Sequence, residues 1–133
     1  MPYPFFDKSK INLDAAEKLN KEALYTPSIH CSYYGVFQYM LHVLSTKTTN
    51  EWHNYLVDIK KDSHSHIKLI NIINKMLRQR NQQDFKYFDE KITELKAMRK
   101  KADYSSDLII QEEAQGSITV ATTLQKLLID NFK

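Results

Sequence analysis

Apolar side chains recur at intervals of three and four residues along most of the 133-residue chain. Residues spaced in this way share one face of an α-helix, whereas a half-buried strand needs apolar and polar residues in alternation. The chain also contains only two glycines and three prolines, which leaves few positions for tight turns or strand bulges. The sequence therefore predicts an all-α fold in which each helix buries one apolar stripe.

The length indicates one domain that covers residues 1–133, because a second hydrophobic core would be cramped at this size. Apolar periodicity and polar breaks predict helices over 8–24, 27–44, 65–80, 84–104 and 112–131, with a short helix from residue 50 to about residue 60. We therefore expect a single bundle of about five to six helices, with an up-and-down core and one short extra helix.

The stretch 27–44 is the most hydrophobic of these segments, and it is predicted to form the central core helix. Thr26 is expected to cap this helix, with Pro27 at its first helical position. Gly35 lies in its middle, where glycine costs a helix about 1 kcal/mol relative to alanine. A neighbouring backbone that leaves no room for a side chain is therefore expected at Gly35, and the alternative is that the helix simply tolerates the glycine.

Local signals also predict the ends and the buried faces of the other helices. Asn50 and Asp84 are good N-caps, because a side-chain oxygen can accept a hydrogen bond from a free amide of the first turn. Residues 108–110 are expected to form an extended apolar link against the core, and Gly116 to mark another close contact. The first helix is expected to bury a stripe of residues spaced by four, namely Ile11, Ala15, Leu19 and Ala23.

No segment indicates a membrane protein or a secreted protein. No apolar run approaches the roughly 18 residues of a membrane span, and the first residues lack the basic-then-apolar order of a signal peptide. The single cysteine, Cys31, is most simply a small buried apolar side chain in a reducing compartment. We therefore expect a cytoplasmic protein without a membrane partner.

The formal charge of +3 is mild, but four cations, Lys96, Arg99, Lys100 and Lys101, occur together with no acid among them. Such a run is usually a solvated helix face, and the alternative is a patch that contacts phosphates. Asp103 follows Arg99 by one helical turn, so an architectural ion pair is the plain interpretation of that spacing. The candidate catalytic residues are Arg99, Asp103 and Tyr104, and the candidate ligand-binding residues are Tyr34, Lys96, Arg99, Lys100 and Lys101.

Tyr33 and Tyr34 are adjacent and therefore about 100° apart around a helix, so they cannot both face the same partner. One is expected in the core and the other in a polar contact, with Tyr34 reaching toward Asp103 or Tyr104. The alternative is that both rings pack and leave their hydroxyls at the surface.

The five histidines do not indicate a metal site. His64 and His66 are two positions apart and point to different sides of a helix, so both are interpreted as ordinary surface histidines. The chain has no His-Glu-x-x-His motif, no cysteine pair and no clustered carboxylates. It also lacks a glycine-rich phosphate loop and a Rossmann fingerprint, so we expect neither a metal nor a cofactor.

Four stretches follow one another in the order and at the spacing of a known family. Residues 15–24 form the first stretch, and Ser32-Tyr33-Tyr34-Gly35-Val36-Phe37 forms the second. Arg99-Lys100-Lys101-Ala102-Asp103-Tyr104 is the third, and the final helix carries Glu112, Glu113 and Ala121. Together these stretches resemble the HEPN superfamily of small α-helical bundles, and in particular its stand-alone prokaryotic members, which are often encoded beside nucleotidyltransferases.

The sequence differs from the family pattern at the histidine that the ribonuclease members use in catalysis. Many HEPN proteins are metal-independent ribonucleases with an Arg-x(4–6)-His motif at a dimer interface. Here Tyr104 and Ser105 stand five and six positions after Arg99, so the histidine of that motif is missing. A tyrosine with an ordinary pKa of about 10 is a poor base at neutral pH, so Tyr104 is no equivalent replacement.

The resemblance therefore implies a nucleotide- or RNA-binding interaction module, as one component of a toxin-antitoxin or nucleotidyltransferase-linked system. It also implies a nucleotidyltransferase partner and a homodimer, to which an exposed aromatic such as Trp52 or Tyr87 could contribute. One alternative is a degenerate metal-independent ribonuclease, with Arg99 at a dimer-interface site and Tyr104 or His30 in proton transfer. The other alternative is a protein-protein interaction or dimerisation module that contacts no nucleic acid.

Overall fold

The structure, a computed structural model, describes residues 3–61 and 64–133, and in these residues it contains helices and no strand. The predicted all-α bundle of five to six helices is confirmed. None of the helices in the described residues combines the length and the apolar character that crossing a membrane would require. The helices are α1 (Phe5–Lys21), α2 (Tyr25–Lys47), α3 (Asn50–Lys61), α4 (Ser65–Arg80), α5 (Gln82–Tyr104) and α6 (Gln111–Asn131).

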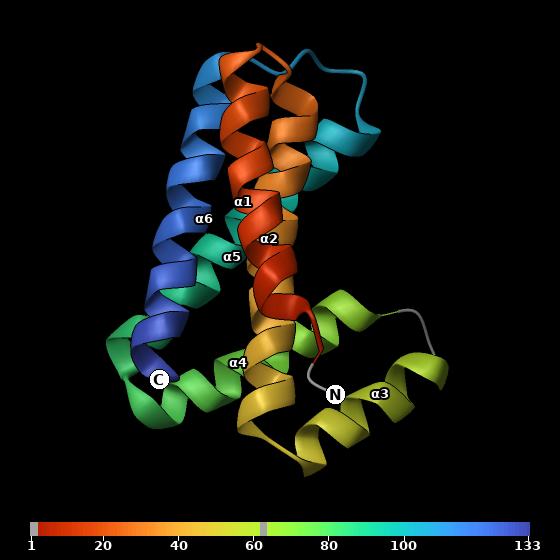
Figure 1. Ribbon diagram of the computed structural model, residues 1–133, viewed down its shortest axis with the longest axis vertical. Coiled ribbons are helices and arrows are strands. Elements are labelled where there is room, and N and C mark those ends of the chain that lie inside the picture. The colour runs from red at the N-terminus through yellow and green to blue at the C-terminus, as the bar shows by residue number, and fades with distance from the viewer. Residues whose placement is uncertain (1–2, 62–63) are drawn as a thin grey trace.

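The helices form an up-and-down arrangement with two helices at one end. α1 and α2 are an antiparallel pair, α5 and α6 are another, and α3 and α4 lie at the lower end of the molecule (Figure 1). The linker between α5 and α6 crosses the upper end. Among the described elements, α2 packs against each of the other five helices, so the predicted central helix is the one the bundle is built around.

Two groups of buried side chains hold the bundle together. The main core lies between α2 and the helices α4, α5 and α6. A smaller cluster lies where α2 begins, α5 ends and α6 begins, and its members are Ile29, Ala102, Ile109 and Ala114. The smaller cluster fixes the first turns of α2 against the last turns of α5, and the candidate site lies there.

α1 both begins and ends three residues earlier than predicted, at Phe5–Lys21 instead of 8–24. It ends in a Schellman turn, in which the Leu24 amide donates to the Leu19 carbonyl and the Ala23 amide donates to the Asn20 carbonyl. Ala23 adopts the left-handed conformation with a φ of 62°. Glycine is usual at that position, so an alanine there carries no signal that the helix ends.

The start of α2 also differs from the prediction. The helix begins at Tyr25, with Leu24 in the N-cap position, so Thr26 is not its cap. Pro27 lies within the first turn and not at the first position. Proline is tolerated there because the amides of a first helical turn have no partner within the helix.

At the starts of α3 and α5, a residue that precedes the predicted cap provides the capping oxygen. Asn81, rather than Asp84, caps α5, because the Asn81 side chain accepts a hydrogen bond from the Asp84 amide at 3.1 Å. Asn50 is the first residue of α3, and the Thr48 hydroxyl accepts a hydrogen bond from the Trp52 amide. In both cases the chemistry of the predicted cap is present a few residues earlier.

The predicted buried face of α1 is only partly correct, because Ala15 and Leu19 are half-buried. Ile11 and Ala23 are exposed, and the buried residues are Ser9 and Ala16. The Ser9 hydroxyl donates to the Gly35 carbonyl of α2 at 2.6 Å. The face of α1 that meets α2 therefore carries Ser9 and Leu13, and Ile11 lies outside it at the surface.

The remaining packing predictions were partly correct. Of the linker residues 108–110, only Ile109 is buried, while Leu108 and Ile110 are exposed. A Cβ at Gly116 would meet no packing neighbour within 4 Å among the residues that the structure describes, so the close contact predicted there is wrong. Trp52 is half-buried and not exposed, because its ring packs against Tyr3, Phe5 and Tyr55.

The lack of room predicted at Gly35 is confirmed, but the closest neighbour is a side chain and not the predicted backbone. A Cβ at this position would lie 2.5 Å from Cδ2 and 2.6 Å from Cγ of Leu13. We expect Gly35→Ala to lower the free energy of unfolding by about 1–3 kcal/mol, because Leu13 and α1 must move. Gly116→Ala is the matched control in α6, and it should raise stability by about 0.5–1 kcal/mol. Equal effects in urea denaturation would contradict this account.

Candidate functional site

The candidate site is centred on Arg99, in the last turns of α5. Arg99 is only 7% exposed. Its guanidinium carbon lies 5.2 Å from the ring centre of Tyr33, and 5.7 Å from those of Tyr34 and Tyr104. Aromatic faces attract a cation, and the attraction grows when water is excluded. The two tyrosines of α2 and the last residue of α5 therefore form an aromatic pocket around a buried positive charge.

The polar partners of Arg99 are distant for a buried cation. Nη1 lies 3.6 Å from Oδ2 of Asp103 and donates to the Tyr104 hydroxyl at 3.4 Å. Nε is buried and has no hydrogen-bond partner among the described residues. The ion pair predicted from the spacing of four is therefore present, but it does not saturate the guanidinium.

His30, from the second turn of α2, adds a histidine to the site. Its Nδ1 lies 2.9 Å from Oδ2 of Asp103, and its ring packs 4.6 Å from the ring of Tyr34. The His30 side chain is 47% exposed and that of Asp103 is 17% exposed. Asp103 thus joins His30 of α2 to Arg99 of α5, with one carboxylate oxygen close to both.

His66, in the first turn of α4, lies below the tyrosines. Its ring stacks on Phe37 at 4.4 Å and is parallel to the ring of Tyr33. Burial, and then the charges of Arg99 and nearby lysines, lower the pKa of His66 to about 4. Burial raises the pKa of Tyr33. Because His66 stays neutral and Tyr33 keeps its proton, we assign the Tyr33 hydroxyl as the donor to His66 Nδ1 at 2.8 Å.

Sequence analysis missed His66, although a signal was present. It was interpreted as a surface histidine because His64 is two positions away. The spacing from His66 to the buried residues Ile70, Ile73 and Leu77 is four, three and four, which places it on the buried stripe of α4. A histidine on a buried stripe is a stronger indication of a site residue than a histidine on a polar face.

The structure separates the four predicted cations into two groups. Lys96 lies three and four positions before Arg99 and Lys100, so the three side chains share one side of α5. All three charges lower the pKa of His66. Burial and the charges of Lys100 and Arg99 lower the pKa of Lys96. Lys101 lies apart, in an ion pair of 2.7 Å with Glu113 of α6. Tyr34 contacts the site through its ring, and no hydrogen bond joins it to Asp103 or Tyr104 among the described residues.

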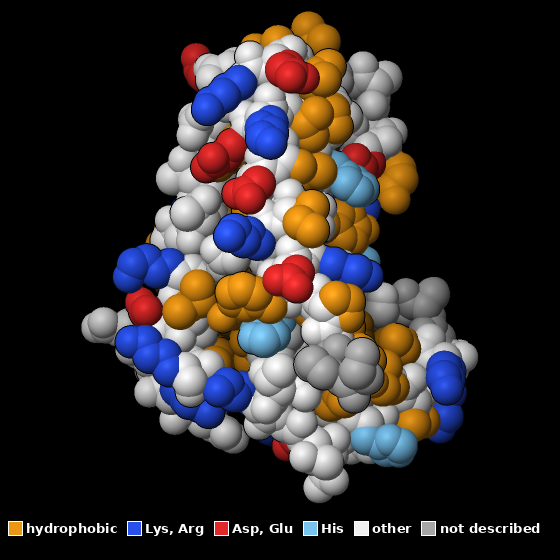
Figure 2. All heavy atoms as spheres, in the orientation of Figure 1, with side chains coloured by type: hydrophobic (Ala, Val, Ile, Leu, Met, Phe, Trp, Pro, Cys, Tyr) orange, Lys and Arg blue, Asp and Glu red, His pale blue; other side chains and the backbone are white. Residues whose placement is uncertain are grey.

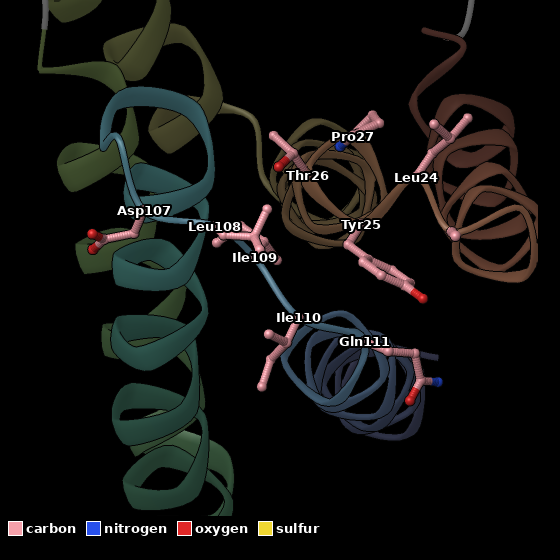
Figure 3. A pocket seen from close by; sticks show the side chains of 10 residues that line it. Leu24, Tyr25, Thr26, Pro27, Asp107, Leu108, Ile109, Ile110 and Gln111 are labelled. Carbon is pink, nitrogen blue, oxygen red and sulfur yellow. The ribbon is translucent and has the colours of Figure 1, made fainter.

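A separate pocket of about 580 Å³ lies at the upper end of the bundle (Figure 3). It is formed by the α1–α2 turn, the first residues of α2 and the linker to α6. Figure 3 shows Leu108 and Ile109 on the α5–α6 linker, where it passes between α5 and α2. The Tyr25 side chain is turned toward α6. Among the described residues that line the pocket, Asp107 alone is charged, so the pocket lacks the cations that a phosphate needs.

The described residues contain no group of three or more His, Cys, Asp or Glu side chains placed to hold a metal ion. No protein-family model matches the chain, and no curated protein and no solved structure matches it either. The chemistry of the site is therefore inferred from its own side chains. They offer a buried cation, two outer lysines, a carboxylate-bound histidine and an exposed tyrosine.

The Arg99–Asp103 contact is expected to stabilise the fold. Asp103→Ala should lower the free energy of unfolding by about 2–3 kcal/mol, because it leaves a buried guanidinium without its carboxylate. The exposed Lys126–Asp130 pair of α6 has the same spacing and a shorter separation of 3.1 Å, yet Asp130→Ala should change stability by less than about 0.5 kcal/mol. An Arg99→Ala protein that melts like the parent would contradict the architectural role.

The lowered pKa of His66 predicts a pH dependence of stability. The unfolded chain, with an ordinary histidine pKa of 6.5, takes up a proton more readily than the folded protein does. The contribution of neutral His66 is therefore complete above pH 6.5 and is lost as the pH falls toward 4. Parent and His66→Asn proteins should differ in this dependence by about 1–2 kcal/mol, allowing for screening. Melting curves of His53→Asn, an exposed histidine of α3, should follow the parent.

Proposed function

We propose that the chain is a HEPN-like module that binds RNA, or a nucleotide, through phosphates at the face formed by Lys96, Arg99 and Lys100. The observation that carries this proposal is the unbalanced positive charge of that face. No carboxylate of residues 3–61 or 64–133 lies within ion-pair distance of Lys96 or Lys100. The carboxylate beside Arg99, that of Asp103, is shared with His30.

The three cations act at different depths. Lys100 is exposed and Lys96 is half-buried, so these two side chains can contact a phosphate directly. Arg99 is almost covered, and it contributes its charge from below. Burial, and then repulsion by Lys100 and Arg99, lowers the pKa of Lys96, and a bound anion would offset that repulsion. The face thus favours a phosphate before any specific contact is formed.

An aromatic side chain beside the cations supports a nucleic acid as the ligand of this face, rather than a free anion. Tyr104 is 76% exposed at the end of α5, although its ring packs against the buried Arg99. An exposed ring next to basic residues is a stacking platform for a base, and single-stranded nucleic acids bind through this combination. In a cytoplasmic protein, as the sequence predicts, RNA is the available single strand.

Lys100 and Lys101 provide a matched test, because they are adjacent in sequence and lie in different surroundings. If the proposal is correct, Lys100→Gln should weaken binding of a single-stranded RNA oligonucleotide, measured by fluorescence anisotropy. The slope of log affinity against log salt concentration should become shallower by roughly 0.7, the loss of one phosphate contact. Lys101→Gln should leave both quantities unchanged. No binding by the parent at low salt would exclude RNA and leave a protein-protein module.

A second function, RNA cleavage, is favoured by the His30–Asp103 contact of 2.9 Å. A histidine held at Nδ1 by a carboxylate has Nε2 left to take a proton, so His30 could do what the missing histidine does in HEPN ribonucleases. In that reaction the 2′-hydroxyl gives its proton to His30 while its oxygen attacks the adjacent phosphorus. The bond from phosphorus to the 5′-oxygen breaks, that oxygen takes a proton from solvent, and the cations stabilise the phosphorane.

Cleavage and binding can be separated with one variant. His30→Gln should reduce the rate of RNA cleavage by at least about 100-fold, the usual contribution of a general base, while the affinity for RNA stays near that of the parent. His53→Gln is the control for loss of an exposed histidine. A parent protein that binds RNA without cleaving it, in a gel assay of single turnover, would remove the ribonuclease candidate and keep the binding module.

The proposed partners follow from the same resemblance. We propose a homodimer and a nucleotidyltransferase partner, within a toxin-antitoxin or nucleotidyltransferase-linked pair. Tyr87 is an exposed aromatic on α5 and is available for such contacts, whereas Trp52 is engaged within the chain. Light scattering of the purified chain would give its oligomeric state directly.

A further inference from the structure

A groove with polar and apolar walls runs along α4 and α5, and it begins beside the candidate site. Two hollows of about 200 and 450 Å³ lie between these helices, and both are lined by Asn71 of α4 and Asp89 of α5. Because they share these residues, they form one groove, which we call the α4–α5 groove. One end is at Lys96, and the other is at Arg78 and Phe85.

The groove continues the cationic face at Arg99. Lys96 lines the groove and is also one of the cations that act on His66, together with Lys100 and Arg99. From Phe85 to Lys96 the groove follows α5 for about 16 Å, given the rise of 1.5 Å per residue. A single phosphate would occupy only the Lys96 end of such a length, whereas a linked strand would follow all of it.

Cations outnumber acids among the described residues that line the groove. Lys75, Arg78 and Lys96 line it, against the single carboxylate of Asp89. That carboxylate accepts a hydrogen bond from Nδ2 of Asn74 at 2.8 Å, so it is held toward α4. The surplus of positive charge favours a polyanion along the groove.

The far end of the groove offers a flat surface as well as charge. The guanidinium carbon of Arg78 lies 4.5 Å from the ring centre of Phe85, so the two planar groups pack together. Bases stack on aromatic rings and on guanidinium planes, whereas an acidic peptide has no use for such a surface. The chemistry therefore matches single-stranded nucleic acid better than it matches an acidic protein.

We infer that the α4–α5 groove is a second binding segment that carries single-stranded RNA onward from the Arg99 face, with phosphates on Lys75, Arg78 and Lys96 and a base at Phe85. This inference rests on the proposed RNA-binding function and names the form of its ligand. Short RNA fills the Arg99 face alone, and longer RNA gains affinity from the groove.

The test compares the binding of an RNA dinucleotide with that of an RNA hexanucleotide to the 133-residue chain, by fluorescence anisotropy. The groove variant is Lys75→Gln with Arg78→Gln, which removes two charges and keeps the side-chain length. The matched control is Lys10→Gln with Lys18→Gln on α1, where charges of both signs are mixed along the outer face (Figure 2). α1 packs mainly on α2 and α6, so the control removes the same net charge away from the groove. Melting curves establish that both variants are folded.

The groove variant should lose the affinity gained by lengthening, and its salt slope for the hexanucleotide should fall by about 1.4, or two phosphate contacts. Its affinity for the dinucleotide and all affinities of the control should match the parent.

Equal losses in both variants would show a nonspecific effect of net charge and overturn the inference. Competition by a polyglutamate peptide of equal charge would overturn it as well. If Lys100→Gln weakens binding and the groove variant does not, the groove is excluded and the proposed function stands. If the parent binds neither oligonucleotide, both are excluded.

Discussion

The buried charge of Arg99 is the constraint on which the upper end of the bundle depends. A guanidinium loses its hydration when it is covered, and the loss is offset only by partners that are fixed around it. Asp103 supplies a carboxylate from the next turn of the same helix, at 3.6 Å. The rings of Tyr33 and Tyr34 supply faces from α2, and that of Tyr104 supplies one from α5. The arginine therefore binds α5 to the central helix as well as charging the site.

Burial, more than the charge of Arg99, sets the protonation of the groups around it. Burial lowers the pKa of His66, and Arg99 lowers it further. Burial raises the pKa of Tyr33, although the charge of Arg99 acts in the opposite direction. His66 is therefore neutral and Tyr33 keeps its proton, so the charge of Arg99 lies among neutral polar groups and one carboxylate, that of Asp103. Further positive charge lies only toward solvent, at Lys96 and Lys100. This layering places the neutral polar groups in the interior and the additional positive charges at the outer surface. It explains how one cluster can stabilise the fold and still attract an anion.

The parts that were predictable from sequence are those that depend on short spacings. The helical period placed each helix of the described chain, and the spacing of four predicted the Arg99–Asp103 pair. The contact of His30 with Asp103 was out of reach, because 73 positions separate the two residues and no local pattern links them. The end of α1 was missed because Ala23 adopts a conformation that glycine usually signals. The resemblance to HEPN proteins stays a prediction.

The site joins three segments that are made at different times. His30 and the tyrosines of α2 lie in the first third of the chain, His66 follows near its middle, and Arg99 comes near the end of the fifth helix. During synthesis, the aromatic face of α2 therefore emerges without its cation and must wait until α5 has left the ribosome. The charged face is complete only after α5 has been made. An emerging chain thus does not present the assembled face to the RNA of the ribosome that is making it.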